Sequence, residues 1–254
     1  MVLNNELLAG KNVLVTGAGR NIGKSIVLEM AKQGANIFFT DIEEKRCRNL
    51  EEELASRKIS SRWFISDVSR TEDADRLSDE LRRQGVSMDV LVNNVGIQLE
   101  TPGLQNLNLH EWEKTFQTNV FGPLYLTKLV SEVMIAKKIH GSILFLTSIH
   151  QSMLFGYASY SCSKAALGML IRELALELAP HKIRVNGIAP GWVAEDEEGN
   201  PRPFGYHPLT NTSITPAYIG RTAVYLASDY FSLFTTGTVV QIDAGLTLIN
   251  PYAR

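Results

Sequence analysis

The sequence has little of what several protein classes require. Only 2 of its 254 residues are cysteine, too few for a disulfide framework, which favours a reducing compartment and predicts a cytoplasmic protein. No apolar run reaches the roughly 18 residues that a membrane span needs. The first ten residues also lack the basic and apolar regions of a signal peptide, so we expect no membrane partner.

The sequence also has almost no excess of charge of either sign. The net charge is -2 and the sequence pI is about 6.2, which gives no general attraction to phosphate polymers, so nucleic acid is not expected as a partner. The 5 histidines show no metal-ligand spacing, and no catalytic metal is predicted. With 44% hydrophobic residues, the chain has enough apolar side chains for a folded core, which excludes intrinsic disorder.

What the sequence does have is a regular alternation of short β-branched or aromatic runs with longer amphipathic segments. This pattern predicts a single α/β domain over residues 1–254, built as a doubly wound parallel sheet of about seven strands with helices on both faces. The predicted strands are Asn12–Thr16, Asn36–Thr40, Arg62–Ser66, Val90–Asn93, Ser142–Thr147, Ile183–Ile188 and Thr238–Ile242. The predicted helices are Ile22–Gln33, Glu43–Arg57, Glu72–Gln84, Glu111–Lys137, Ala158–Ala179 and Ala217–Ala227.

One stretch departs from that alternation. Residues 190–216 carry Pro201, Pro203, Pro208 and the acidic run Glu195–Glu198, with no strand or helix pattern. Long segments without regular structure inside a compact domain usually serve function. We therefore expect a mobile lid over a substrate site.

A glycine-rich turn follows the first predicted strand. Thr16-Gly17-Ala18-Gly19-Arg20-Asn21-Ile22-Gly23 leads into the first helix, whose unpaired N–H groups and partial positive charge suit a pyrophosphate. Asp41 ends the second strand 18 residues after Gly23, the position of a carboxylate that accepts hydrogen bonds from ribose hydroxyls. Together they predict dinucleotide binding; the alternative is a structural turn beside a solvated Asp41.

Two charged residues bear on the choice of dinucleotide. The Asp41 carboxylate would repel a 2′-phosphate across partly buried space, which favours NAD over NADP. Arg20 acts in the opposite direction, because its guanidinium could pair with a 2′-phosphate. The strand-end placement of Asp41 is the more specific feature, so NAD is the predicted cofactor and NADP the alternative.

Further motifs resemble those of the short-chain dehydrogenase/reductase family, and the likeness covers essentially the whole chain. Thr16–Gly23 is similar to that family's Thr-Gly-x-x-x-Gly-x-Gly turn, with Asn21, which tolerates positive φ, in place of the middle glycine. Asn93-Asn94-Val95-Gly96 resembles Asn-Asn-Ala-Gly after the fourth strand. Pro190-Gly191 matches the family's Pro-Gly, although Trp192-Val193-Ala194-Glu195 follows where a Thr is usual.

The resemblance implies a Rossmann-type fold and a bound nicotinamide cofactor. Asp67 is similar to the family's Asp that holds the adenine ring. The residues to which the resemblance assigns cofactor binding are Gly17, Gly19, Arg20, Asn21, Ile22, Gly23, Asp41, Asp67, Val68, Asn94, Val95, Gly96, Tyr160, Lys164, Pro190, Gly191 and Val193.

Four positions align with the family's catalytic set: Asn119, Ser148, Tyr160 and Lys164. Tyr160 and Lys164, four residues apart, share one helix face, where the ammonium would lower the pKa of the phenol. The resemblance implies that Tyr160 is the base in alcohol oxidation and the acid in ketone reduction, and that Lys164 also holds the nicotinamide ribose. Ser148 would donate to the substrate oxygen, and Asn119 would hold a water that links Lys164 to solvent. Taken singly, each residue could instead be structural.

The predicted substrate-binding residues are Gln98, Ser148, His150, Gln151, Tyr160 and Trp192. Ser148-Ile149-His150-Gln151 resembles the Ser-x-His-Glu segment of short-chain sugar dehydrogenases, which favours a sugar, sugar acid or polyol, although His150 could equally cap the strand end. The alternatives are a 3-oxoacyl thioester or steroid substrate in the same family. A nicotinamide-binding regulatory protein without turnover is a further alternative.

The segment Ala158–Ala179 is apolar on more than one face. One apolar stripe suffices for packing on the sheet, so a second one suggests burial against another copy of the chain. Family members commonly pair through this helix, often as tetramers, and we expect a homo-oligomer, dimer or tetramer. Coverage by the lid or by the C-terminal segment Leu246–Arg254 is the alternative.

Overall fold

The structure is a computed structural model that describes residues 6–99, 103–197 and 199–249. Glu198 of the acidic run and residues 250–254 of the predicted C-terminal cover lie outside the described residues. Within them, the strands form one seven-stranded parallel sheet in the order β3-β2-β1-β4-β5-β6-β7. The strands are β1 (Asn12–Thr16), β2 (Asn36–Asp41), β3 (Ser61–Ile65), β4 (Val90–Asn93), β5 (Ser142–Leu146), β6 (Arg184–Pro190) and β7 (Val239–Ile242).

The strand order reverses at β1, which pairs with β2 on one side and β4 on the other. Val15 of β1 lies opposite Phe39 of β2 and Val92 of β4. In an open parallel sheet, ligands bind beyond the carboxyl ends of the strands at such a reversal. All five residues of β5 are buried, as expected where helices cover both faces of a sheet.

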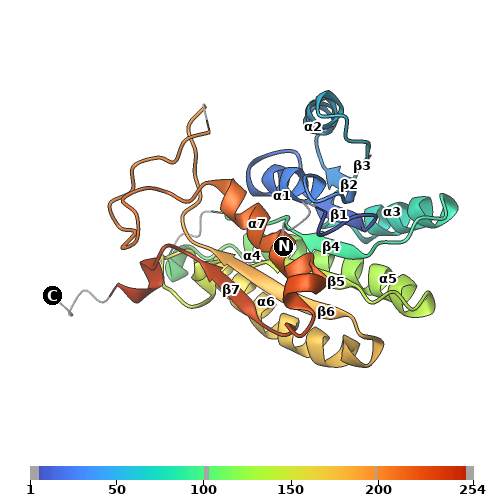
Figure 1. Cartoon of the computed structure of the whole chain (residues 1–254). Helices are drawn as coiled ribbons and strands as arrows, with labels where there is room; N and C mark the ends of the chain where they lie inside the picture. Colours follow the sequence, from blue (N-terminus) through green and yellow to red (C-terminus); the bar gives the residue numbers. More distant parts are fainter. Residues whose placement is uncertain (1–5, 100–102, 198, 250–254) are drawn as a thin grey trace.

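Two layers of helices cover the sheet (Figure 1). On one face α1 (Asn21–Ala31), α2 (Glu44–Ser56) and α7 (Pro216–Ala227) share a core with β1 and β2. On the other face α3 (Thr71–Arg83), α5 (Gly122–Ala136) and α6 (Ala158–Leu178) pack on β4 and β5. The remaining helical segments are α4 (Leu109–Phe116), α8 (Asp229–Ser232), the π-helical turn Gln117–Phe121, and the 3-10 turns Leu104–Asn106, Ile149–Gln151, Ala179–His181 and Leu246–Leu248.

The predicted strands and helices are confirmed to within a few residues, with one informative difference. The expected single helix Glu111–Lys137 is interrupted by the π-helical turn Gln117–Phe121. In an uninterrupted α-helix the carbonyl of Asn119 would accept a bond from residue 123, which is proline and has no N–H. A π turn accommodates the missing bond, and such turns are frequent at functional sites.

Residues 191–215, which we call the strap, connect β6 to α7 and are orange in Figure 1. They contain neither a helix nor a continuous strand among the described residues, but isolated bridges fold the strap back on itself. Val193 pairs with Ile214, and Pro203 pairs with Thr212. A lid role for the strap stays a prediction. No helix among the described residues is both long and apolar enough to cross a membrane.

Candidate active site

A cavity of about 590 Å³, which we call the site cavity, opens where β4, β5 and β6 end. Loops after these strands, the N-terminal part of α6 and the strap supply its walls. Twelve of the predicted site residues line it. They are Ile22, Asn94, Gly96, Gln98, Ser148, His150, Tyr160, Lys164, Pro190, Gly191, Trp192 and Val193.

Lys164 is the buried charge of this cavity. Its side chain is 2% exposed, and its Nζ donates a hydrogen bond of 2.7 Å to the carbonyl of Leu146 at the end of β5. The same Nζ lies 5.5 Å from the centroid of the Tyr160 ring. Burial lowers the pKa of Lys164 from 10.5 to about 8, because the charged form loses its hydration.

Tyr160 sits one helical turn before Lys164, and its hydroxyl forms a hydrogen bond with Ser148. We expected Lys164 to lower the pKa of Tyr160. Instead, burial raises the pKa of Tyr160, and the hydrogen bond from Ser148 opposes that rise only in part. The Lys164 ammonium donates its hydrogen bond to Leu146, and its charge is not among the causes that act on the pKa of Tyr160.

His150 packs against the reactive tyrosine. Its ring meets that of Tyr160 edge-on with centroids 5.0 Å apart and stacks on Phe155 at 4.2 Å. Its Nδ1 lies 3.1 Å from the Ser161 hydroxyl, and burial, with a smaller effect of the Lys164 charge, lowers the pKa of His150. His150 is therefore mainly neutral at pH 7, and its ring lines the site cavity.

Asn119 lies in the π-helical turn and is fully buried behind the cavity. Its Oδ1 accepts from the Ile97 N–H at 2.8 Å, and its Nδ2 donates to the Ile97 carbonyl at 2.9 Å and to Ser163 at 3.0 Å. These bonds fasten the segment after β4 to the turn before α5. The side chain thus positions the loop that carries Gly96 and Gln98.

A second opening, of about 260 Å³, lies over the glycine-rich turn. Gly17, Arg20, Asn21, Ile22, Gly23, Asp41, Asn94, Val95 and Gly96 are among the residues that line it. Asn21 has a φ of 46°, which asparagine tolerates, so the turn forms without the family's middle glycine. No side chain caps the N-terminus of α1, which leaves its first N–H groups available to an anion.

The turn is locked to the end of β4. Asn94 donates from Nδ2 to the carbonyls of Thr16 at 2.9 Å and Gly17 at 3.0 Å. A Cβ on Gly23 would lie 2.2 Å from the Gly17 carbonyl oxygen and 2.6 Å from the Asn94 amide. Only glycine fits at residue 23, because the helix starts in direct contact with the turn.

Asp41 ends β2 with its carboxylate 5% exposed. Oδ2 accepts from the Gly19 N–H at 3.0 Å, and Oδ1 accepts from the Glu43 N–H at 3.1 Å. Arg46, in the first turn of α2, places a guanidinium nitrogen 3.5 Å from Oδ1. Asp41 is thus held in place beside the turn, and a cation partly neutralises it.

A family model described as enoyl-(acyl carrier protein) reductase matches residues 17–247 of the chain. The chain belongs to the short-chain dehydrogenase/reductase family. It is therefore an oxidoreductase of CH–OH groups that uses a nicotinamide cofactor and a small-molecule substrate.

Individual relatives of this short-chain dehydrogenase differ in substrate and cofactor. A glucose 1-dehydrogenase of Gluconobacter oxydans is 31% identical over 97% of this chain and 96% of its own. The structure of a gluconate 5-dehydrogenase from Burkholderia cenocepacia, bound to NADP and tartrate, is 26% identical with a TM-score of 0.86, covering 96% and 97% of the two chains. A 7α-hydroxysteroid dehydrogenase with NADH and 7-oxo glycochenodeoxycholic acid is 27% identical with a TM-score of 0.86, covering 96% and 98%.

Five predicted residues of this dehydrogenase line neither opening: Gly19, Asp67, Val68, Asn119 and Gln151. Asp67 accepts hydrogen bonds from the backbone and hydroxyl of Ser69, and neither Asp67 nor Val68 is a lining residue. Gly19 also lines neither opening but donates to Asp41.

Gln151 of the predicted substrate set does not line the site cavity. It ends the 3-10 turn Ile149–Gln151, and a Cβ on Gly168 of α6 would lie 3.3 Å from its Oε1. Gln151 therefore faces α6 rather than the site cavity, where the turn has directed His150 instead.

Several lining side chains of this dehydrogenase were not predicted. Phe155 and Tyr157 from the loop before α6, Phe204 from the strap and Leu246 from the turn after β7 complete the site cavity. Their only sequence signal is proximity to Ser148, Tyr160 or the Pro-rich segment. Trp192 and Phe204 contact each other with ring centroids 4.2 Å apart, so the strap contributes an aromatic wall.

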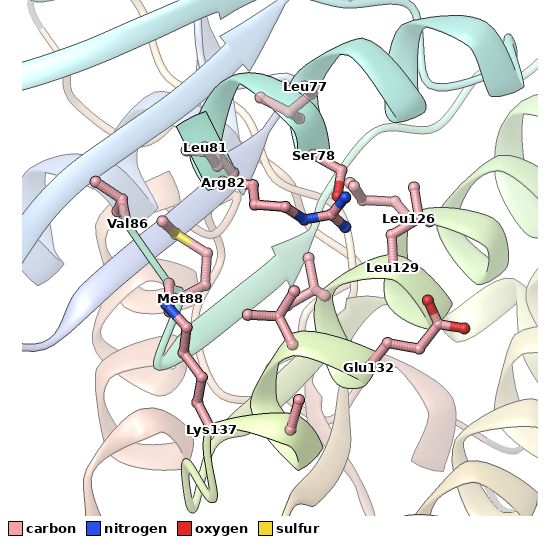
Figure 2. A pocket seen from close by; sticks show the side chains of 14 residues that line it. Leu77, Ser78, Leu81, Arg82, Val86, Met88, Leu126, Leu129, Glu132 and Lys137 are labelled. Carbon is pink, nitrogen blue, oxygen red and sulfur yellow. The ribbon is translucent and has the colours of Figure 1, made fainter. Parts of the chain in front are cut away.

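A further cavity of about 310 Å³ lies between α3 and α5 and is lined by none of the predicted site residues; we call it the α3/α5 cavity (Figure 2). Apolar side chains such as Leu77, Leu81 and Leu126 form its walls. Charged groups occur only among its half-buried or exposed residues, including Arg82 and Glu132. Among the described residues, no group of three or more histidine, cysteine, aspartate or glutamate side chains could hold a metal ion.

Proposed function

We propose that this enzyme transfers a hydride between NAD and a secondary alcohol or ketone of a sugar, sugar acid or polyol, and that Tyr160 moves the proton. The observation that carries the proposal is the meeting, in one cavity, of the Tyr160 phenol, the Ser148 hydroxyl and the Lys164 ammonium. A carbinol placed among them would have a proton acceptor and a hydrogen-bond donor at its oxygen.

The residues around the turn fit a dinucleotide. The uncapped N-terminus of α1 supports pyrophosphate binding, and Asp41 supports binding of the adenosine ribose hydroxyls. Lys164, Gly96 and Pro190–Val193 line the site cavity and would hold the nicotinamide end. When bound, the nicotinamide would accept a hydride in oxidation or donate one in reduction.

The chain's own residues would then handle the proton. In oxidation the Tyr160 oxygen would take the proton of the substrate hydroxyl; in reduction it would return one to the carbonyl oxygen. Ser148 would donate a hydrogen bond to that oxygen as negative charge develops. Lys164, held by Leu146, would supply positive charge beside the phenol, and Asn119 would keep the adjoining loop in place.

A polyhydroxylated substrate is supported by the polar and aromatic groups around Tyr160. His150 and Gln98 both line the cavity, and the Nδ1 of His150 is already engaged with Ser161, which leaves its Nε2 for a substrate hydroxyl. The rings of Phe155, Trp192 and Phe204 offer apolar faces that can pack on the C–H surfaces of a sugar. Closure of the strap over this wall would exclude water.

A 3-oxoacyl thioester or steroid is the second candidate substrate. The same three aromatic residues favour it, because an acyl chain or a steroid ring also needs an apolar wall. The two candidates differ in their need for His150 and Gln98, which would hydrogen-bond the additional hydroxyls of a sugar but not an acyl chain.

A homo-oligomer, dimer or tetramer, is also part of the proposal. The face of α6 that does not pack on the sheet exposes Met169 at 56% and Leu176 at 75%. Apolar side chains at helical spacing on an outer face favour contact with a second copy. Sedimentation of the purified chain would test this directly.

The proposed reaction is tested by following NADH formation at 340 nm over a panel of aldoses, aldonates, polyols, hydroxysteroids and 3-hydroxyacyl thioesters. We expect the highest kcat/KM with a member of the first three groups. Turnover only of the steroid or thioester would replace the substrate class. Absence of turnover across the panel despite measurable NAD binding would reject the proposal.

A further inference from the structure

The Asp41 carboxylate at the end of β2 is not alone, because a guanidinium group lies beside it. Arg46 reaches it from the first turn of α2, with one guanidinium nitrogen 3.5 Å from Oδ1 and the other 2.6 Å from the Glu43 carboxylate. The Arg46 side chain is 26% exposed and lines the opening over the glycine-rich turn.

The position of Arg46 is fixed by packing on the turn. A Cβ added to Gly19 would lie 2.5 Å from the Arg46 Cβ and 2.7 Å from the Asp41 Oδ2. The first part of the arginine side chain is therefore in direct contact with the turn, and its guanidinium lies next to Asp41 rather than free in solvent.

Arg20 supplies a second cation to the same opening, from the turn rather than from α2. Its side chain makes no hydrogen bond or ion pair with the part of the chain that the structure describes, and it is exposed. Two guanidinium groups thus line the opening together with the Asp41 carboxylate, and the Glu43 carboxylate pairs with Arg46, so the formal charge of the four groups sums to zero.

Because these charges balance, Asp41 disfavours the 2′-phosphate of NADP less than a lone carboxylate would. Repulsion between Asp41 and a 2′-phosphate is offset by attraction to Arg46, which lies within a few ångströms of the same carboxylate. Arginine is also the side chain best suited to bidentate contact with a phosphate. Hydrogen bonds from Gly19 and Glu43 still hold the Asp41 carboxylate for the ribose hydroxyls of NAD.

We propose that Arg46 sets the cofactor selectivity of this enzyme: paired with Asp41, it allows the site to bind NADP as well as NAD and keeps the preference for NAD small. This inference rests on the proposed function, since it presumes that the turn holds a dinucleotide. It adds a residue on α2 that would contact the 2′ position of the adenosine ribose.

The test compares NAD⁺ and NADP⁺, which differ only by the 2′-phosphate, in calorimetric titrations without substrate, so that turnover does not enter. For the wild type we expect a ratio of Kd for NADP⁺ to Kd for NAD⁺ below about 30. In Arg46→Leu we expect that ratio to rise at least about tenfold through weaker NADP⁺ binding, with Kd for NAD⁺ changed by less than about threefold. Arg46→Lys, which keeps the charge, should lie between the two.

Arg48→Leu is the matched control. Arg48 lies on the same helix, is 61% exposed, pairs with Glu44 and does not line the opening. Its replacement should leave the ratio of the two Kd values unchanged.

The salt dependence of binding by the wild-type protein is a second test, and it needs no variant. Between 50 and 500 mM NaCl, NADP⁺ binding should weaken more than NAD⁺ binding.

The outcomes separate the inference from the proposed function. Failure to bind either dinucleotide would overturn both. Tight NAD⁺ binding with undetectable NADP⁺ binding in the wild type, or a ratio that changes by less than twofold in Arg46→Leu, would overturn the role of Arg46 alone. Equal salt dependence for the two cofactors would overturn it too, even if the Arg46→Leu protein failed to fold.

Discussion

The site cavity and the α3/α5 cavity are both concave and partly apolar, yet they differ in where their polar groups lie. In the site cavity, Lys164 is 2% exposed and donates to Leu146, while the Tyr160 hydroxyl bonds to Ser148. In the α3/α5 cavity, the charged residues are exposed and form pairs outside it, such as Arg82 with Asp79. Figure 2 shows this cavity between the two helices, with leucine side chains directed into it.

Concave apolar space by itself therefore does not identify a reactive site. Burying an ammonium without a carboxylate partner is unfavourable for folding, whereas an imperfect contact between two helices leaves apolar space without any chemistry. The site cavity also lies at the carboxyl ends of the strands, next to the reversal of strand order at β1. Substitutions in the two cavities should therefore separate activity from stability.

Tyr160→Phe should give the largest effect. The substitution removes only the hydroxyl that bonds to Ser148, so the cavity keeps its shape while the proton-transferring group is lost. We expect kcat/KM to fall by about 1,000-fold or more and Kd for NAD⁺ to change by less than about threefold. Steady-state kinetics and calorimetry on the same preparation measure both values.

Ser161→Ala is a useful companion, since Ser161 lies on the same helix and contacts His150 rather than the reacting oxygen. It should lower kcat/KM by far less than Tyr160→Phe does. A Tyr160→Phe protein with wild-type turnover would refute the proton-transfer role.

Much of the fold could be predicted, because its signals are local. Strand β5 is a continuous run of buried residues, and its predicted bounds, Ser142–Thr147, exceed the observed Ser142–Leu146 by one residue. The long helix before β5 was predicted without its π turn, since apolar periodicity continues through Gln117–Phe121. The consequence of Pro123 for the Asn119 carbonyl becomes clear only once the helix is known to extend across it.

Within the candidate site, the sequence spacing of two residues was enough to predict that they lie side by side when both belong to the same helix. Tyr160 and Lys164 follow from a separation of four residues on α6. Gln151 does not line the site cavity, because the 3-10 turn that follows Ser148 places it against α6, and its role in substrate binding stays a prediction. Arg46 could not be found from spacing, because its role depends on the packing of α2 against the glycine-rich turn.

Leu126→Ala should have the opposite profile to Tyr160→Phe. Leu126 is 2% exposed and lines the α3/α5 cavity, so truncation enlarges existing empty space. We expect the free energy of unfolding to fall by about 2–5 kcal/mol, with kcat/KM unchanged within twofold at temperatures where the protein is folded. Denaturant titration measures the stability, and Leu129→Ala, in a half-buried position on the same helix, should cost less. A tenfold loss of kcat/KM would contradict the separation of the two cavities.

Lys164→Met should remove activity and yet stabilise the protein at pH 7. Burial lowers the pKa of Lys164 from 10.5 to about 8, so the folded protein at pH 7 contains a charged amine at a cost of about 3 kcal/mol. Loss of the hydrogen bond to Leu146 offsets about 1 kcal/mol, which leaves a net gain of about 2 kcal/mol for the variant.

The pH dependence of that gain checks its cause. Between about pH 8 and 10.5 the unfolded wild type binds more protons at Lys164 than the folded wild type does, so wild-type stability rises with pH. The advantage of Lys164→Met should therefore shrink over this range and vanish near its upper end. A constant difference across the range would exclude burial of charge as the cause.

Ser78→Leu should give the smallest effect, and it probes the α3/α5 cavity by filling it. Ser78 is half-buried on α3 and its side chain lines the cavity opposite Leu126, so the three added carbon atoms have room (Figure 2). We expect thermal and denaturant unfolding to show a gain of about 1 kcal/mol or less. Ser78→Ala separates the contribution of helix propensity, because it raises propensity without filling the space. Since no buried polar group depends on this cavity for its partners, kcat/KM should stay within twofold of wild type; a larger change would mean that the two cavities are coupled through α5.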